Sequence, residues 1–143
     1  MVSLVWDAPV DLDLRVVTPS GKIVDPKHPS TADAVDGKVD PSAPGTGVID
    51  TDALLNCVNT GHRRENLVWQ QSPALGRYFV YANLYDACGQ AAVRFTLSLN
   101  RPEPLADGGA RLTSTDERSG ELLAMDANVG SALGLFVSEF LVQ

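Results

Sequence analysis

Four aspartates in two short motifs are the residues of this 143-residue chain whose types and spacing could do chemistry. Asp11 and Asp13 alternate with leucines in a run typical of a β-strand, and Asp50 and Asp52 repeat the D-x-D spacing. Residues two apart on a strand point to the same face, about 7 Å apart by strand rise. Carboxylates placed in this way repel each other unless a cation or an arginine lies between them.

A hard cation such as Ca²⁺ suits these side chains, because it takes about six to eight oxygens from carboxylates, amides and backbone carbonyls. Asn56 adds an amide oxygen shortly after Asp52. The sequence therefore predicts a Ca²⁺ site whose ligands all carry side-chain oxygens: Asp11, Asp13, Asp50, Asp52 and Asn56. Asp7 and Glu65 could complete the ligand shell.

Ion pairing is the alternative to a metal site. Asp11 and Asp13 could pair with Arg15, Arg63 or Arg64, which would leave the other acids in solvent. The D-x-D motif is short, and the chain contains no complete EF-hand loop. Spacing alone therefore does not decide between the two arrangements.

Motifs for enzyme chemistry are absent from the sequence. It contains no G-x-S-x-G elbow, no phosphate-binding loop, no H-E-x-x-H and no Rossmann glycine pattern. Its two histidines, His28 and His62, stand in polar segments, where a lone histidine is usually a solvated surface residue. We therefore expect a protein that is not an enzyme. A small carboxylate-based hydrolase using the acidic residues is the less favoured alternative.

The charge balance limits the range of partners. The chain has 11 Lys and Arg against 18 Asp and Glu, which gives a formal net charge of −7 at pH 7. Because an acidic surface repels phosphate backbones, nucleic acid is not an expected partner. No apolar run approaches the ~20 residues that span a bilayer, so no membrane span is expected.

The elements that must position these residues are β-strands. Short runs alternate apolar and polar residues, most clearly Asp11–Val17 and Val93–Leu99, and turn residues separate them. The pattern predicts an all-β fold, an antiparallel β-sandwich of about 8–9 strands with jelly-roll or Ig-like topology. It indicates a single domain over residues 1–143. Residues 25–47, a proline-rich stretch without apolar period, are expected to form one long loop.

Two further expectations concern the C-terminal part of the chain. The turn-like segment 116–120 is expected to join strands at 111–115 and 121–125 in a hairpin. The apolar pattern of residues 133–142 predicts a last β-strand, whose side chains are apolar enough to require burial against another surface. An exposed sheet edge of that kind invites pairing with another chain, so a homo-oligomer formed through edge strands is one expectation.

The two cysteines, Cys57 and Cys88, are separated by 31 positions and form no C-x-x-C motif. They are too few for a zinc site unless the histidines contribute. A disulfide formed in an oxidising compartment is one interpretation. Two separate buried thiols are the other, since free cysteine behaves as a small apolar residue. The residues by themselves do not choose between them.

An ordered set of motifs resembles the YfaP-like bacterial domain, a family of unassigned function. The motifs are, in order, W-D followed by D-L-D-L at residues 6–14, P-S-G at 19–21, D-x-D at 50–52, E-N-L-V-W at 65–69 and P-A-L-G-R-Y-F-V at 73–80. The match covers about residues 3–99. It is similar to the variant in secreted proteins and lipoproteins of myxobacteria, in which N-C and C-G pairs stand where this chain has Asn56-Cys57 and Cys88-Gly89.

The resemblance implies an extracytoplasmic β-sandwich, whether periplasmic, surface-anchored or secreted, with a Cys57–Cys88 disulfide. It also implies a shared polar site built around the two D-x-D motifs. Arg15 stands where the family pattern has histidine, so no role of that histidine carries over. Residues 100–143 match nothing in the family. A D-L-D also occurs in calcium-binding sandwiches of the tellurite-resistance type, whose glycine-rich acidic signature this chain lacks.

Three functions follow as hypotheses. The favoured one is a non-enzymatic extracytoplasmic binding module that engages protein or glycan partners at the cell surface and is stabilised by Ca²⁺. The second is a structural surface subunit that self-associates through edge strands. The third is the small hydrolase, which would require the aspartates for turnover.

Overall fold

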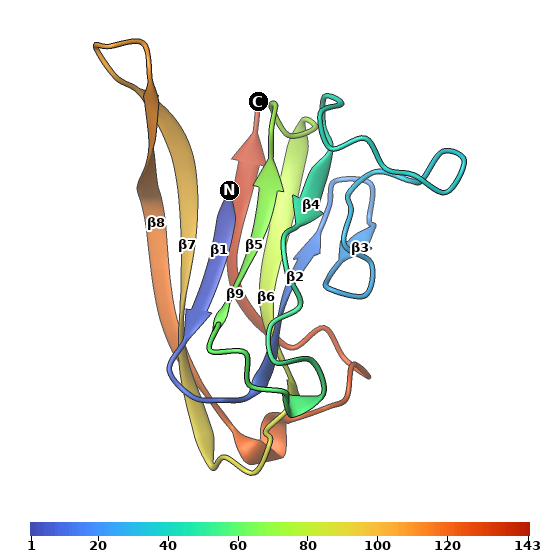
Figure 1. Ribbon diagram of the computed structural model, residues 1–143, viewed down its shortest axis with the longest axis vertical. Coiled ribbons are helices and arrows are strands. Elements are labelled where there is room, and N and C mark those ends of the chain that lie inside the picture. Colours follow the sequence, from blue (N-terminus) through green and yellow to red (C-terminus); the bar gives the residue numbers. More distant parts are fainter.

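A computed structural model describes all residues 1–143 and shows two antiparallel sheets packed face to face as a β-sandwich (Figure 1). The first sheet has five strands, which are, in spatial order, β4 (Gly47–Ile49), β5 (Arg64–Trp69), β1 (Val2–Trp6), β7 (Ala92–Pro104) and β8 (Ala110–Leu123). The second sheet has four: β3 (Ile23–Val24), β2 (Asp11–Val17), β6 (Gly76–Asp86) and β9 (Leu135–Val142). The all-β antiparallel sandwich with nine strands is therefore confirmed.

Side chains of strand β2 alternate between the two faces of the second sheet, one facing the core and one facing outward. Leu12, Leu14 and Val16 are fully buried against the first sheet, as the alternating pattern predicts. Asp11 and Asp13 point the other way, yet both are also buried. The outer face of β2 is therefore covered by other parts of the chain.

Strands β7 and β8 correct one sequence-based expectation. The segment 116–120 is not a hairpin turn, because β8 runs from Ala110 to Leu123 and pairs with β7 along its length, apart from a bulge at Thr115. The reversal lies at residues 105–109, where Gly108 has a φ of 85° that favours glycine. Residues 116–120 are polar because they lie on an exposed edge strand rather than in a turn.

The end of the β7–β8 hairpin projects beyond the sandwich as an arm, defined here as residues 100–114 (Figure 1). The pairing of β1 with β7 stops at Leu99, and apart from two hydrogen bonds between Asn100 and Met1 the arm's strands pair only with each other. Both of its strands are exposed over most of this length.

The connection between β3 and β4 is long and contains only short backbone bridges, in agreement with the predicted proline-rich loop. Two single 3₁₀ turns, η1 (Leu55–Cys57) and η2 (Ala124–Asp126), are the helical elements of the chain. None of its helical segments has the length and apolar character that crossing a membrane requires.

Candidate metal site

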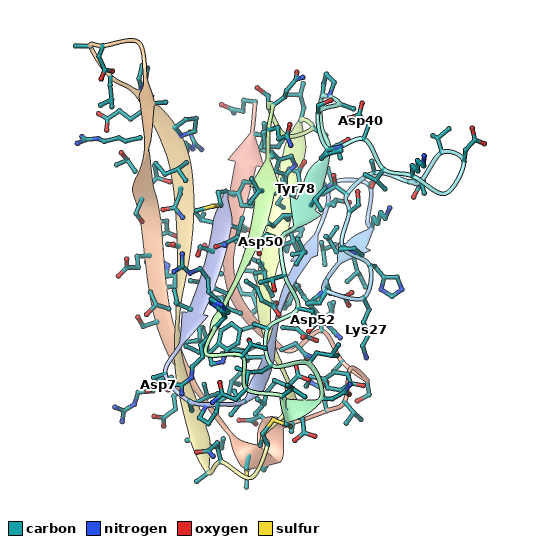
Figure 2. The ribbon with its side chains drawn as sticks, viewed as in Figure 1. Asp7, Lys27, Asp40, Asp50, Asp52 and Tyr78 are labelled. Atoms are coloured by element: carbon teal, nitrogen blue, oxygen red, sulfur yellow. A yellow bond between two sulfur atoms is a disulfide. The ribbon has the colours of Figure 1, made fainter.

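Three carboxylates meet on the outer face of the second sheet. Asp11 and Asp13 come from β2, and Asp52 comes from the segment between β4 and η1. One oxygen from each of these side chains lies within 4.8 Å of the others. We refer to Asp11, Asp13 and Asp52 as the acidic cluster. Figure 2 shows Asp52 on this side of the sandwich, beside Lys27.

Surrounding segments bury the two aspartates of β2. Asp11 is 2% exposed and Asp13 is 4% exposed. The next outward residue of the strand, Arg15, donates a hydrogen bond to the carbonyl of Ala132 in the loop before β9. Its Nε lies 3.5 Å from a carboxylate oxygen of Asp25 in the loop after β3. Two loops are thus held over β2, and the cluster is set into the surface.

Glu65 ties the cluster's segments together from within the core. Its side chain is fully buried between the sheets. One carboxylate oxygen accepts the backbone N–H of Leu14 at 2.8 Å, and the other accepts the N–H of Ala53 at 3.1 Å. Because Ala53 follows Asp52, this residue fixes the loop aspartate relative to β2. The role of Glu65 here is to position the cluster's segments.

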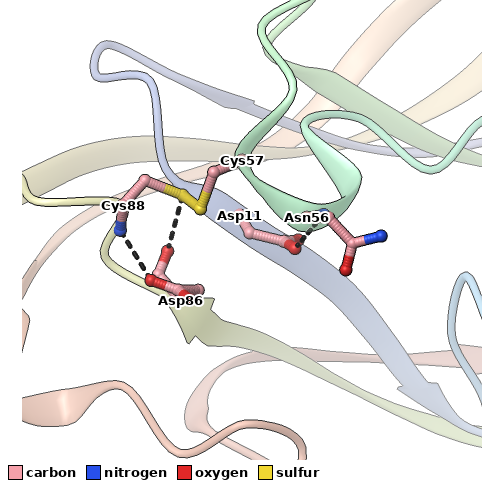
Figure 3. Close-up of a disulfide and its surroundings, with 5 residues drawn as sticks. All are labelled: Asp11, Asn56, Cys57, Asp86 and Cys88. Carbon is pink, nitrogen blue, oxygen red and sulfur yellow. Dashed lines mark hydrogen bonds between the residues drawn. A yellow bond between two sulfur atoms is a disulfide. The ribbon is translucent and has the colours of Figure 1, made fainter.

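A disulfide closes the other side of the cluster (Figure 3). Cys57 and Cys88 are bonded, with their Cα atoms 5.6 Å apart, which confirms the disulfide interpretation. The backbone N–H of Asn56 donates to Oδ2 of Asp11 at 3.2 Å. Asn56, Cys57 and Cys88 all have positive φ values, of 53°, 62° and 50°, a conformation uncommon for residues other than glycine. The cross-link and the hydrogen bond together hold this backbone against β2.

The electrostatic environment of the cluster disfavours three free negative charges. Burial raises the pKa of Asp11 to about 6, and the nearby charge of Asp52 adds to the effect. Burial also raises the pKa of Asp13 to about 7, with a further contribution from Asp11. The pKa of Asp52 is raised by desolvation as well. A cation at the cluster would offset both causes.

Two carboxylates of the cluster lack protein partners for their oxygens. Asp13 receives no hydrogen bond, and its nearest cationic atom, Nη2 of Arg15, is 4.0 Å away. The Oδ1 atom of Asp52 is buried without a hydrogen-bond partner. Buried polar groups in folded proteins are nearly always paired, so unpaired acceptors at one point indicate a missing donor or cation. Arginine pairing, the alternative considered from the sequence, leaves Asp13 only this one distant contact.

The acidic cluster lines a cavity of about 70 Å³. Its remaining walls are residues from three segments: Lys27, Leu55, Asn56 and Tyr85. A space of this size suits a single ion and is too small for a sugar ring. With three carboxylates, the walls offer oxygen ligands of the kind that Ca²⁺ prefers.

The residues predicted as ligands are not all brought together. Asp11, Asp13, Asp52 and Asn56 line the cavity, whereas Asp50 does not. Both carboxylate oxygens of Asp50 accept hydrogen bonds from Asn66, one from its backbone N–H and one from its side chain. Asp50 and Asp52 lie beyond the end of β4 at Ile49, so the alternation of a regular strand does not place their side chains on one face.

Asp7 likewise lies away from the cavity, where its carboxylate accepts the backbone N–H of Arg94. Lys27 and Tyr85 also line the cavity and were not predicted from the sequence; they come from the loop after β3 and from the end of β6. No short motif links them to the aspartates. Their proximity depends on how the proline-rich loop folds over the second sheet.

Comparisons with protein-family models, with curated proteins and with solved structures found no match. These comparisons therefore do not assign the chain to a family. The function proposed below rests on the geometry of the acidic cluster, on the disulfide and on the sequence motifs.

Proposed function

We propose that this protein is a non-enzymatic, extracytoplasmic binding module whose fold is stabilised by Ca²⁺ at the acidic cluster. The observation that carries the proposal is the Asp13 carboxylate, which is buried, accepts no hydrogen bond and faces a cavity shared with two further carboxylates. A cation there would relieve their mutual repulsion and supply the absent partner. In this assignment Asp11, Asp13, Asp52 and Asn56 are the ligands.

The choice of Ca²⁺ follows from the type and number of donors. The cavity presents carboxylate oxygens, no histidine lines it, and no thiolate is available because the two cysteines are bonded to each other. Oxygen-only sites on loops favour hard cations, and Ca²⁺ accepts irregular geometry more readily than Mg²⁺. The ligands come from β2 and from a loop held by Glu65 and the disulfide, so they are largely fixed before the ion arrives.

The extracytoplasmic location is supported by the disulfide. Disulfides persist in oxidising compartments and are rare where thiols are kept reduced. The resemblance to YfaP-like domains of secreted proteins and lipoproteins points the same way. A module in that setting would meet protein or glycan partners at the cell surface. The long loop between β3 and β4 and the β7–β8 arm are exposed surfaces that a partner could contact.

The test is thermal unfolding of the non-reduced protein in EDTA and then in millimolar Ca²⁺. A ligand present at a hundredfold excess over its Kd stabilises the folded state by about 2.7 kcal/mol. For a domain of this size we expect a rise in melting temperature of roughly 5–10 °C. No rise would contradict the calcium site and leave a disulfide-stapled interaction module.

A matched pair of variants within one D-x-D motif sharpens this test. Asp52→Asn removes a cluster carboxylate, so it should abolish the Ca²⁺-dependent rise while leaving stability in EDTA unchanged or higher. Asp50→Asn removes a carboxylate that bonds only to Asn66, so the Ca²⁺-dependent rise should persist. Equal responses from both variants would place the ion elsewhere.

Self-association through edge strands is a second candidate function, favoured by a separate observation. Strand β9 is the last strand of the second sheet, and Leu135, Phe136 and Leu141 along it are more than two-fifths exposed. An edge with such side chains is a template for pairing with another chain. Light scattering over a range of protein concentrations tests it: a mass of one chain at all concentrations would exclude this function.

A further inference from the structure

Lys27 lines the cavity at the acidic cluster. It is the one basic residue among the cavity's walls. Its ammonium lies over the ring of Tyr85, 3.9 Å from the ring centroid, in a cation–π contact. Figure 2 shows the Lys27 side chain extending from its loop at the margin of the sandwich, next to Asp52. The acidic cluster thus has a cation of its own chain beside it.

The backbone of Lys27 is held in place by a buried aspartate. Oδ1 of Asp25 accepts the backbone N–H of Lys27 at 3.1 Å and that of His28 at 2.8 Å. Asp25 is itself 5% exposed and lies 3.5 Å from Nε of Arg15 on β2. The turn is therefore anchored to the same strand that carries two cluster aspartates, and the Lys27 side chain starts from a fixed point.

The Lys27 side chain, in contrast, is exposed and weakly held. Its ammonium has the contact with Tyr85 and the long-range attraction of the carboxylates, and it forms no ion pair within 4.0 Å. The positive charge also lowers the pKa of Asp11 and Asp52 against the effect of burial. A divalent ion at the cluster would repel this ammonium, because both are positively charged.

We propose that Lys27 competes with the metal ion for the acidic cluster, and that binding of Ca²⁺ displaces its ammonium from Tyr85. This inference rests on the proposed calcium site. Lys27 supplies partial charge compensation while the ion is absent, which keeps three carboxylates together at lower cost. Its departure on ion binding uncovers the Tyr85 ring beside the filled cavity. Calcium binding would then change the surface offered to a partner in both charge and aromatic exposure.

The first experiment compares Ca²⁺ affinity by isothermal titration for the wild-type protein, Lys27→Gln and Lys38→Gln. Removing the competing charge should tighten Ca²⁺ binding by roughly tenfold in Lys27→Gln. Lys38→Gln is the matched control, because Lys38 lies in the same long loop and is not part of the cavity wall. It carries the same change in net charge, so its affinity should equal that of the wild type.

The second experiment follows Lys27 directly by NMR during a Ca²⁺ titration. Protons of its ε-methylene group over the Tyr85 ring should be shifted upfield without Ca²⁺. They should move toward ordinary lysine values as the site fills. The change should follow the same binding curve as the titration heat. Protons that stay shifted at saturating Ca²⁺ would overturn the proposal.

The outcomes separate this inference from the calcium site itself. Equal affinities for wild type and Lys27→Gln would contradict the competition while leaving the site intact. If Lys27→Gln binds Ca²⁺ and the wild-type protein does not, the competition is supported, and the lysine excludes the ion completely at the Ca²⁺ concentrations used. Binding by neither protein would contradict the calcium site, and with it the role given to Lys27.

Discussion

Oε2 of Glu65 on β5 accepts the backbone N–H of Leu14 on β2 at 2.8 Å, and this bond joins the two sheets through the core. The other carboxylate oxygen accepts the N–H of Ala53. A fully buried carboxylate is costly, and burial raises the pKa of Glu65 well above its usual value. The two backbone donors offset part of that cost. They also set the position of Asp52 relative to β2.

Removal of the Glu65 side chain should therefore be strongly destabilising. Glu65→Ala leaves two buried backbone N–H groups without acceptors and opens a cavity, so we expect a loss of about 2–5 kcal/mol in the free energy of unfolding. Urea unfolding in EDTA measures this without the contribution of a bound ion. The control is Glu117→Ala on the exposed edge strand β8, which should change stability by no more than ~0.5 kcal/mol. Similar losses for both variants would contradict this role of Glu65.

Stability should fall with rising pH when Ca²⁺ is absent. The pKa of Asp11 is raised to about 6 and that of Asp13 to about 7, so the folded state holds more protons than the unfolded state between about pH 4 and pH 7. The stability associated with these protonated groups is fully present below the unfolded pKa and is lost as pH rises through the folded values. Bound Ca²⁺ favours the ionised form and should remove or reverse the decline.

Urea unfolding at several pH values between 4 and 8, in EDTA and in Ca²⁺, measures this effect. Asp13→Asn isolates the contribution of one group, because asparagine does not ionise. In EDTA this variant should lose less stability than the wild type between pH 4 and pH 8. Parallel curves for the two proteins would show that Asp13 does not titrate as its burial implies.

Local sequence patterns predicted the sandwich well but could not predict which residues meet. Leu12, Leu14 and Val16 follow a strict alternation, and the core lies where that alternation places it. The hairpin turn predicted at 116–120 was wrong, because an exposed edge strand and a turn can both be rich in small and charged residues. The register of β8 on β7 decides this point, and it depends on the whole hairpin.

The candidate site shows the same limit. Asp11 and Asp13 share a face, as strand geometry requires. Asp50 and Asp52 lie beyond the end of β4 at Ile49, and only Asp52 joins the cluster. Lys27 reaches the cluster only through the fold of a loop without apolar period. The spacing of the two cysteines does not decide whether they form a disulfide, and only the family resemblance implies one. Side-chain periodicity therefore predicts faces of strands, and tertiary packing determines the site.

The β7–β8 arm should be dispensable for the fold. Its strands beyond Asn100 pair only with each other, and isolated two-stranded ribbons add little stability in water. Replacing residues 102–112 by Asn-Gly joins Arg101 to Thr113, which are opposite each other in the register. The melting temperature should change by no more than ~2 °C, and the Ca²⁺-dependent rise should be unaltered. A larger loss would show that the arm packs on the sandwich.

Loss of the disulfide should weaken calcium binding as well as the fold. On the chain-entropy model, a cross-link spanning 31 positions stabilises the folded state by about 3–4 kcal/mol. The same link holds Asn56, whose N–H donates to Asp11, and the loop that begins at Asp52. Without it, the residues with positive φ can relax toward commoner conformations.

The double variant Cys57→Ser, Cys88→Ser tests both effects in one protein. Thermal unfolding in EDTA reports the loss of stability, and isothermal titration below the melting temperature reports the Ca²⁺ affinity. We expect the affinity to fall roughly tenfold, since about 1.4 kcal/mol of preorganisation changes a binding constant by that factor. A variant that melts earlier yet binds Ca²⁺ with unchanged affinity would assign the cross-link to the fold alone. In that case Glu65 and the Asn56–Asp11 hydrogen bond would suffice to position the loop side of the cluster.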